Sequence, residues 1–106
     1  MGFFDFFGIL DINRGLEEYH TMPGAVLLDV RTSQEYREGH IPGSQNVPLQ
    51  FLDTISSMIS SKQTPVFVYC YSGSRSSQAV KKLGKMGYKN VKNLGGISSY
   101  SGKVEH

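Results

Sequence analysis

The sequence predicts an α/β domain built on a mainly parallel sheet. Two runs, residues 25–30 and 65–70, are apolar almost without interruption, which is typical of strands that are covered on both faces. Segments whose apolar residues recur at helical spacing lie between these runs. Strands that alternate with helices in this way form parallel sheets, with the helices packed against the sheet faces.

The first half of the chain contains four predicted elements. Residues 14–22 carry a weak helical pattern, and the apolar run at 25–30 follows as a strand. Thr32 and Glu35 form a capping box, which predicts a short helix that starts there and ends at Gly39. Residues 45–47 form a short candidate strand.

The second half of the chain alternates more regularly. A helix is predicted after Pro48, and the most apolar strand follows at residues 65–70. A further helix is predicted from about Arg75 and ends at Gly87, and residues 90–94 form a strand near a sheet edge. The apolar positions that indicate the two helices are Leu49, Leu52, Ile55, Met58 and Ile59 for the first, and Ala79, Val80, Leu83 and Met86 for the second.

The composition indicates one small globular domain. The chain has 106 residues, of which 39% are hydrophobic and 19% are charged. The net charge is +2 and the basic residues form no stripe with interleaved aromatics, so we expect no nucleic acid partner. No apolar run reaches the ~18 residues of a membrane span. His40 has no second histidine nearby, so we expect neither a metal ion nor another cofactor.

The first eight residues differ from the rest of the chain, because four phenylalanines lie within residues 3–7. Such an arm contacts a membrane surface, binds a partner or folds back onto the core, and its short length favours the core. It lacks the basic start and the cleavage site of a signal peptide. The single cysteine has no partner for an internal disulfide and fits a reducing compartment. We therefore expect an arm at residues 1–8, one domain at residues 9–106 and a cytoplasmic location.

That single cysteine, Cys70, lies where the most apolar strand stops and a polar turn begins. A free cysteine is often only a small buried hydrophobic residue. In parallel α/β sheets, however, ligands bind beyond the carboxyl ends of the strands. The position of Cys70 therefore favours a functional role over a purely structural one.

The residues after Cys70 predict a loop that binds an anion. A glycine in the loop relaxes the backbone, so that several N–H groups turn inward at the start of the next helix. The same dipoles favour the thiolate, and cysteines in such places often have a pKa of ~7 or below instead of ~8.5. We predict Cys70 as the catalytic nucleophile, and the predicted substrate-binding residues are Tyr71, Ser72, Gly73, Ser74, Arg75 and Ser76.

The spacing between Cys70 and Arg75 distinguishes two kinds of enzyme. A cysteine phosphatase has five residues between its cysteine and arginine, because a phosphoryl group needs a wide cradle and a fork-shaped donor. Here only four residues intervene, and the tighter ring suits a persulfide sulfur carried on Cys70. Sulfur transfer is preferred, and a small cysteine-dependent phosphatase or arsenate reductase is the alternative. The intact cysteine argues against a non-catalytic binding module.

Two segments of the chain resemble the rhodanese-like sulfurtransferases. The first signature is matched by LLDVR at 27–31, EY at 35–36, GHIPGS at 39–44 and NVP at 46–48. The second is matched by VYC at 68–70 with Gly73, Arg75 and Ser76, and by LGGI at 94–97. The resemblance implies a three-layer rhodanese-like domain with a five-stranded, mainly parallel sheet flanked by helices. It also implies that Cys70 takes a sulfane sulfur from thiosulfate or a persulfide and passes it to a thiol, cyanide or protein acceptor.

The charged residues near the predicted site permit two interpretations each. Asp29 and Arg31 are either a catalytic acid and an anion clamp, or a structural pair that ties the strand end to the following helix with Glu35 or Glu38. The structural pair is favoured, because ion pairs commonly have such local roles. Arg75 either binds the anion directly or pairs with a carboxylate such as that of Asp29, and both interpretations stay open.

Overall fold

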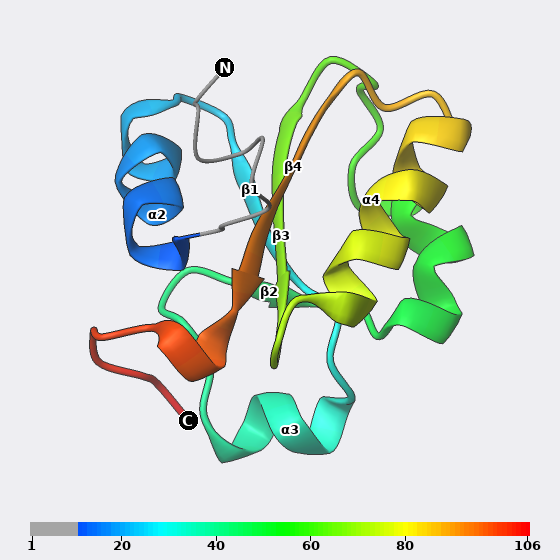
Figure 1. The fold of residues 1–106 in the computed structure, drawn as a ribbon. Helices are drawn as coiled ribbons and strands as arrows, with labels where there is room; N and C mark the ends of the chain where they lie inside the picture. The colour runs from blue at the N-terminus through cyan, green and yellow to red at the C-terminus, as the bar shows by residue number, and fades with distance from the viewer. Residues whose placement is uncertain (1–10) are drawn as a thin grey trace.

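The computed structural model describes residues 11–106, which form a parallel sheet with helices on both faces (Figure 1). The strand order is β2-β1-β3-β4, and each neighbouring pair runs parallel. This arrangement confirms the predicted fold class. The strands are β1 (Val26–Asp29), β2 (Gln45–Asn46), β3 (Pro65–Cys70) and β4 (Asn90–Gly96).

Within residues 11–106 the sheet has four strands, and not the five that the family resemblance implied. The four strands coincide with the four extended segments that the residue pattern predicted. The remaining segments of this part of the chain are helices or polar turns, which carry no further run of strand-forming residues. An isolated antiparallel bridge between His40 and Glu105 lies outside the named strands.

Helices cover both faces of the sheet, and the side chains of β3 alternate between them. Phe67 and Tyr69 pack in one core cluster with residues of α2, whereas Val66, Val68 and Cys70 pack in the other with residues of α4 and η1. Figure 1 shows α2 on one side of the sheet and α4 on the other. The helices are α2 (Ile12–Thr21), α3 (Ser33–Glu38) and α4 (Ser74–Lys85), with the 3-10 helices η1 (Leu49–Ser57) and η2 (Ile97–Ser99).

The predicted helices are confirmed, with changes at their ends and in one helix type. α3 starts at the predicted capping box, where Thr32 Oγ1 accepts from the Glu35 backbone N–H and Glu35 Oε1 accepts from the Thr32 backbone N–H. The helix after Pro48 is of the 3-10 type. Its buried residues Leu52 and Ile55 are three positions apart, which suits three residues per turn.

The carboxyl ends of the strands point to one end of the molecule, where α3, η2 and the start of α4 also lie (Figure 1). None of the helices within residues 11–106 is long and apolar enough to cross a membrane. The Phe-rich arm predicted at residues 1–8 lies outside the described residues, so its role stays a prediction. The candidate site is built at the carboxyl ends of β1 and β3.

Candidate active site

Cys70 is the last residue of β3, and a short loop joins it to α4. The side chain is fully buried, at 0% exposure. Gly73, the N-cap of α4, has φ 109° and ψ −12°, a left-handed conformation that glycine adopts without a steric penalty. This turn brings the first N–H groups of α4 over the sulfur of Cys70.

The loop and the start of α4 contact the sulfur of Cys70. The backbone N–H of Gly73 donates to Sγ at 3.0 Å, and the backbone N–H of Ser76 donates at 3.3 Å. The hydroxyl oxygen of Ser76 lies 3.4 Å from Sγ, where it accepts from the protonated thiol. The two backbone donors belong to the start of α4, where N–H groups have no partner within the helix. They form a cradle that suits a negatively charged sulfur.

These contacts shift the protonation equilibrium of Cys70. Burial acts to raise the pKa of the thiol, because it penalises the charged form. Once the thiol has lost its proton, the Ser76 hydroxyl can donate to the sulfur. This hydrogen bond, with those from the backbone of Ser76, Gly73 and Ser72, outweighs burial and lowers the pKa below its ordinary value. The thiolate is therefore more available than in an exposed cysteine.

The cysteine loop lies directly on the end of β4. A Cβ atom at Gly96 would overlap the carbonyl oxygen of Tyr71 and come within 2.6 Å of Ser72 Cα. Gly96 is also paired with Cys70 in the β3–β4 register. The missing side chain at Gly96 thus allows the close approach of two backbones.

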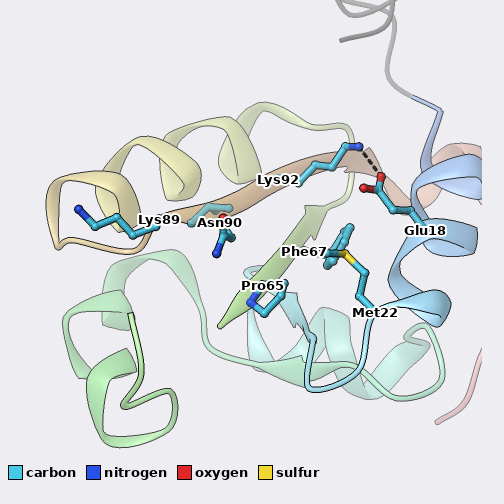
Figure 2. Close-up of a pocket in the computed structure, with 8 residues that line it drawn as sticks. Glu18, Met22, Pro65, Phe67, Lys89, Asn90 and Lys92 are labelled. Atoms are coloured by element: carbon cyan, nitrogen blue, oxygen red, sulfur yellow. Dashed lines mark hydrogen bonds and ion pairs between the residues drawn. The ribbon is translucent and has the colours of Figure 1, made fainter. Parts of the chain in front are cut away.

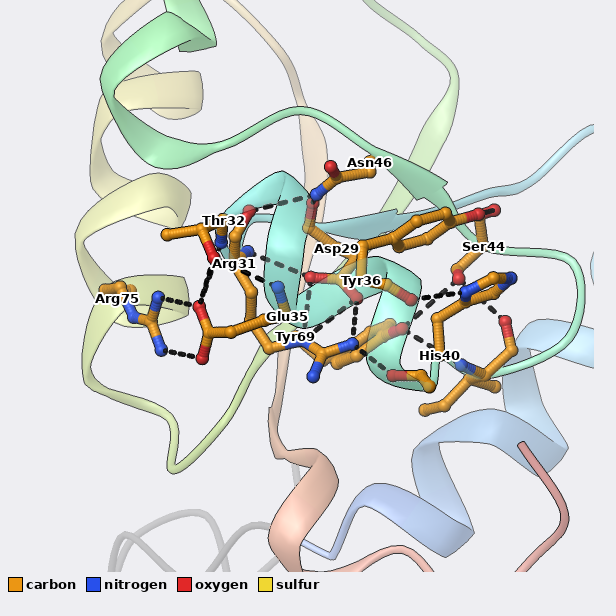
Figure 3. Close-up of polar contacts among 12 residues, drawn as sticks. Asp29, Arg31, Thr32, Glu35, Tyr36, His40, Ser44, Asn46, Tyr69 and Arg75 are labelled. Atoms are coloured by element: carbon orange, nitrogen blue, oxygen red, sulfur yellow. Dashed lines mark hydrogen bonds and ion pairs between the residues drawn. The ribbon is translucent and has the colours of Figure 1, made fainter. Parts of the chain in front are cut away.

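Arg75 is held by a carboxylate from another element. Its Nη1 donates to Glu35 Oε1 at 2.7 Å and its Nη2 donates to Glu35 Oε2 at 3.0 Å (Figure 3). Hydrogen bonds from Arg75, with a smaller contribution from Thr32, lower the pKa of Glu35 to about 2 despite partial burial. The carboxylate that pairs with Arg75 is thus that of Glu35 and not that of Asp29. The pair connects the first turn of α3 to the first turn of α4.

Asp29 and Arg31 form a second, buried ion pair (Figure 3). Arg31 Nη2 lies 2.7 Å from Asp29 Oδ2, and the two residues are 5% and 0% exposed. The same Nη2 donates to the carbonyl oxygen of Gly39 at 2.8 Å. The pair therefore connects the end of β1 to the end of α3, and the described contacts include neither Glu35 nor Glu38.

Hydrogen bonds of Tyr69 connect β3 to the segment that follows α3 (Figure 3). The Tyr69 hydroxyl accepts from the Ile41 backbone N–H at 3.1 Å and donates to Ser44 Oγ at 3.2 Å. Burial, reinforced by the charge of Asp29, raises the pKa of Tyr69, so the hydroxyl stays protonated and can donate. These contacts hold the segment of residues 39–44 in place beside the site.

The predicted loop residues separate into two groups. The side chains of Tyr71, Ser72 and Ser74 are exposed, whereas Ser76 is fully buried and contacts Cys70. One contact residue was missed by the sequence reasoning: Asn93 of β4 accepts a hydrogen bond from Ser76 at 2.8 Å. No local pattern marks an asparagine of a strand as the partner of a serine in a helix.

Figure 2 shows a pocket in the described structure, and Cys70 is not among its lining residues. It has a volume of about 250 Å³ and lies at the opposite, amino ends of β3 and β4, next to α2. We therefore do not assign this pocket to the chemistry of Cys70. Its lining residues are Glu18, Met22, Pro65, Phe67, Lys89, Asn90, Val91 and Lys92.

The fold and the site define an α/β domain in which backbone N–H groups surround a cysteine at the junction of a strand and a helix. Among domains of this class, the family model described as Rhodanese-like domain matches residues 12–103. The thiosulfate sulfurtransferase PspE of Escherichia coli is 38% identical over 71 residues, which are 66% of this chain and 68% of PspE. The chain therefore belongs to the rhodanese-like domain family.

Two further similarities agree with this membership. The adenylyltransferase and sulfurtransferase uba4 of Ogataea parapolymorpha is 33% identical over 91 residues, which are 85% of this chain but only 23% of uba4. A solved structure described as a rhodanese with anions from E. coli has a TM-score of 0.71 and 33% identity, and the match covers 76% of this chain and 96% of that one.

Proposed function

We propose that this protein is a sulfurtransferase that carries a sulfane sulfur on Cys70 as a persulfide. The observation that carries the proposal is the pair of backbone donors from Gly73 and Ser76 on the sulfur of Cys70. The names of the relatives PspE and uba4, both of which include sulfurtransferase, support the same reaction class.

In the first half of the proposed reaction, the Cys70 thiolate attacks the outer sulfur of thiosulfate. A new S–S bond forms at Sγ, the S–S bond of thiosulfate breaks, and sulfite leaves with the electron pair. A persulfide donor reacts in the same way and leaves as a thiolate. Charge is conserved, and no oxidant or reductant is needed.

In the second half, a nucleophilic acceptor attacks the outer sulfur of the persulfide. Cyanide takes the outer sulfur and leaves as thiocyanate. A small thiol or a protein thiol takes it and becomes a persulfide. The Cys70 thiolate is the leaving group, so the donors from Gly73 and Ser76 stabilise the charge as it returns to Sγ. The outer sulfur lies about 2.05 Å beyond Sγ, and the cradle therefore needs to enclose only one additional atom.

We propose a positioning role for Arg75 in this reaction. Both of its terminal nitrogens bind Glu35, so the pair adds little net charge to the site. Arg75→Gln should then slow transfer from doubly charged thiosulfate and from a singly charged donor, such as an organic thiosulfonate, by similar factors. A rise in KM for thiosulfate alone would instead indicate that Arg75 binds the anion directly.

Intact-mass spectrometry tests the proposed function. After incubation with thiosulfate and removal of excess donor, the wild type should gain the mass of one sulfur atom, and cyanide should remove it. Cys70→Ser should show neither the gain nor any turnover, and Ser77→Ala serves as a control in the same helix. A wild type that stays unmodified with thiosulfate and with persulfide donors would refute the proposal.

Activity toward aryl phosphates tests the alternative enzyme class. Phosphoryl transfer requires simultaneous stabilisation of several oxygens, and only four residues separate Cys70 from Arg75. The wild type should therefore hydrolyse aryl phosphates no faster than Cys70→Ser. Phosphatase activity that depends on Cys70 would favour the cysteine phosphatase.

A further inference from the structure

Asn93 of β4 lies beside the cysteine loop without contacting the sulfur itself. Its Oδ1 lies 2.8 Å from Ser76 Oγ and also accepts from the Gly95 backbone N–H at 2.8 Å. Because a backbone N–H can only donate, the amide atom that faces Ser76 is the carbonyl oxygen. The orientation of the Asn93 amide is thus set by the backbone of β4.

The hydroxyl of Ser76 is surrounded by acceptors. Besides Asn93 Oδ1, the carbonyl oxygens of Gly73 and Gly95 lie 3.0 and 3.4 Å from Ser76 Oγ. A serine hydroxyl has one hydrogen to donate. With a protonated Cys70, the thiol donates to Ser76 Oγ and the hydroxyl hydrogen goes to an oxygen, of which that of Asn93 is nearest.

Loss of the thiol proton changes this arrangement. A thiolate can only accept, so a Ser76 hydroxyl that still points to Asn93 would present a lone pair to the negative sulfur. Hydrogen bonds to a charged acceptor are about twice as strong as neutral ones, which favours rotation of the hydroxyl hydrogen from Asn93 to Sγ. The sulfur of Cys70 and the oxygen of Asn93 therefore compete for one hydrogen.

We propose that Asn93 is a positioning residue of this site, because its carbonyl competes with the Cys70 sulfur for the Ser76 hydroxyl and so controls how readily the thiolate forms. The inference rests on the proposed function, in which the Cys70 thiolate is the nucleophile and later the leaving group. When Cys70 carries sulfur, the hydroxyl returns to Asn93. When the thiolate departs, the hydroxyl donates to it.

The strand geometry keeps Asn93 fixed while the hydroxyl turns. The pairing of β3 with β4 shifts by one residue between Val68–Asn93 and Tyr69–Gly95, which leaves Leu94 without a partner in the register. Asn93 Oδ1 binds the Gly95 N–H inside this irregularity. A useful variant must therefore keep an acceptor for the Gly95 N–H and remove the acceptor that binds the Ser76 hydroxyl.

Asn93→Ser meets this requirement, because a serine hydroxyl can accept from the backbone N–H two residues later but is one bond too short to reach Ser76. The thiolate is followed by its ultraviolet absorbance, with Cys70→Ser as the blank for the tyrosines. In Asn93→Ser the titration midpoint of Cys70 should fall by at least about 0.5 pH unit. Asn90→Ser, in the same strand but away from the site, should leave the midpoint unchanged.

A double-mutant cycle with Ser76→Ala distinguishes competition for the hydroxyl from a general loosening of the loop. In the Ser76→Ala background, Asn93→Ser should no longer shift the midpoint. An unchanged or raised midpoint in Asn93→Ser, or a fall that persists without the Ser76 hydroxyl, would overturn the proposal. If circular dichroism shows Asn93→Ser to be unfolded, Asn93→Thr gives the same test with a better strand former.

The titration requires no sulfur donor, so it is independent of the test of the proposed function. A protein that takes up no sulfur but shows the expected cycle would refute sulfur transfer and keep the role of Asn93 in controlling the thiol. A protein that takes up sulfur but shows no shift would refute only the role of Asn93.

Discussion

The backbone nitrogen of Gly73 lies 3.0 Å from the sulfur of Cys70. The contact is possible because Gly73 adopts a positive φ at the N-cap of α4, so that its N–H turns back toward the end of β3. The sulfur thus accepts hydrogen bonds from a helix start, a location where negative charge is favoured.

Removal of the Ser76 hydroxyl should raise the pKa of Cys70. Hydrogen bonds from the side chain and from the backbone of Ser76 both lower that pKa. Ser76→Ala removes the side-chain hydrogen bond and keeps the backbone N–H of residue 76 as a donor. The pH profile of sulfur transfer should rise as Cys70 ionises, and its midpoint should move up by about one unit, because a hydrogen bond to a charged group is worth about 1.5–3 kcal/mol. Ser77→Ala should not move the midpoint, and equal midpoints in both variants would contradict the assigned contact.

Gly96→Ala should displace the cysteine loop. The added Cβ overlaps the Tyr71 carbonyl oxygen, and relief of such a clash typically costs about 1–3 kcal/mol. Sulfur transfer should fall at least ~10-fold, since loss of one aligned donor costs about 2 kcal/mol or more. The control is Gly84→Ala in α4, where a Cβ meets no atom within 4 Å. Chemical denaturation and initial rates measure the two effects, and normal activity in Gly96→Ala would contradict the close packing.

Asp29→Asn should destabilise the whole domain. The substitution leaves the buried Arg31 guanidinium without its counter-charge, and removal of one partner from a buried pair costs about 3–5 kcal/mol. Asp53→Asn removes an exposed carboxylate that pairs with Lys82 and should cost less than about 1 kcal/mol. Urea unfolding compares the two free energies, and similar losses would show that the Asp29–Arg31 pair contributes little.

The Glu35–Arg75 pair should stabilise the fold only above acidic pH. The pKa of Glu35 is lowered to about 2 in the folded state, from its ordinary value of 4.5. The stabilisation is thus fully present above about pH 4.5, the unfolded value, and is lost as pH falls toward 2. The wild type should exceed Glu35→Gln in unfolding free energy at neutral pH by about 1 kcal/mol or less, because the pair is partly exposed.

Unfolding of these two proteins across acidic pH measures the effect. Their difference should shrink between pH 4.5 and 2. A difference that stays constant over this range would mean that the charge of Glu35 is not what stabilises the pair.

Several features of the fold could be predicted because their causes lie within a few residues. The capping box of Thr32 and Glu35 closes over three positions, and both of its hydrogen bonds are present. The continuous apolar run of β3 reflects burial on both faces of the sheet, and its end locates Cys70 at the edge where the loop begins. The fifth strand, which came from the family resemblance and from no run in this sequence, is not found within residues 11–106.

By itself, the sequence determined the α/β class, the position of Cys70 at a strand end and the glycine that turns the chain into α4. Only the tertiary structure decided which groups surround that position. Glu35 and Arg75 are 40 residues apart, and Ser76 and Asn93 are 17 apart. Their contacts depend on the order and register of the strands, including the one-residue shift between β3 and β4. Packing of the whole core sets that register, and no local preference encodes it.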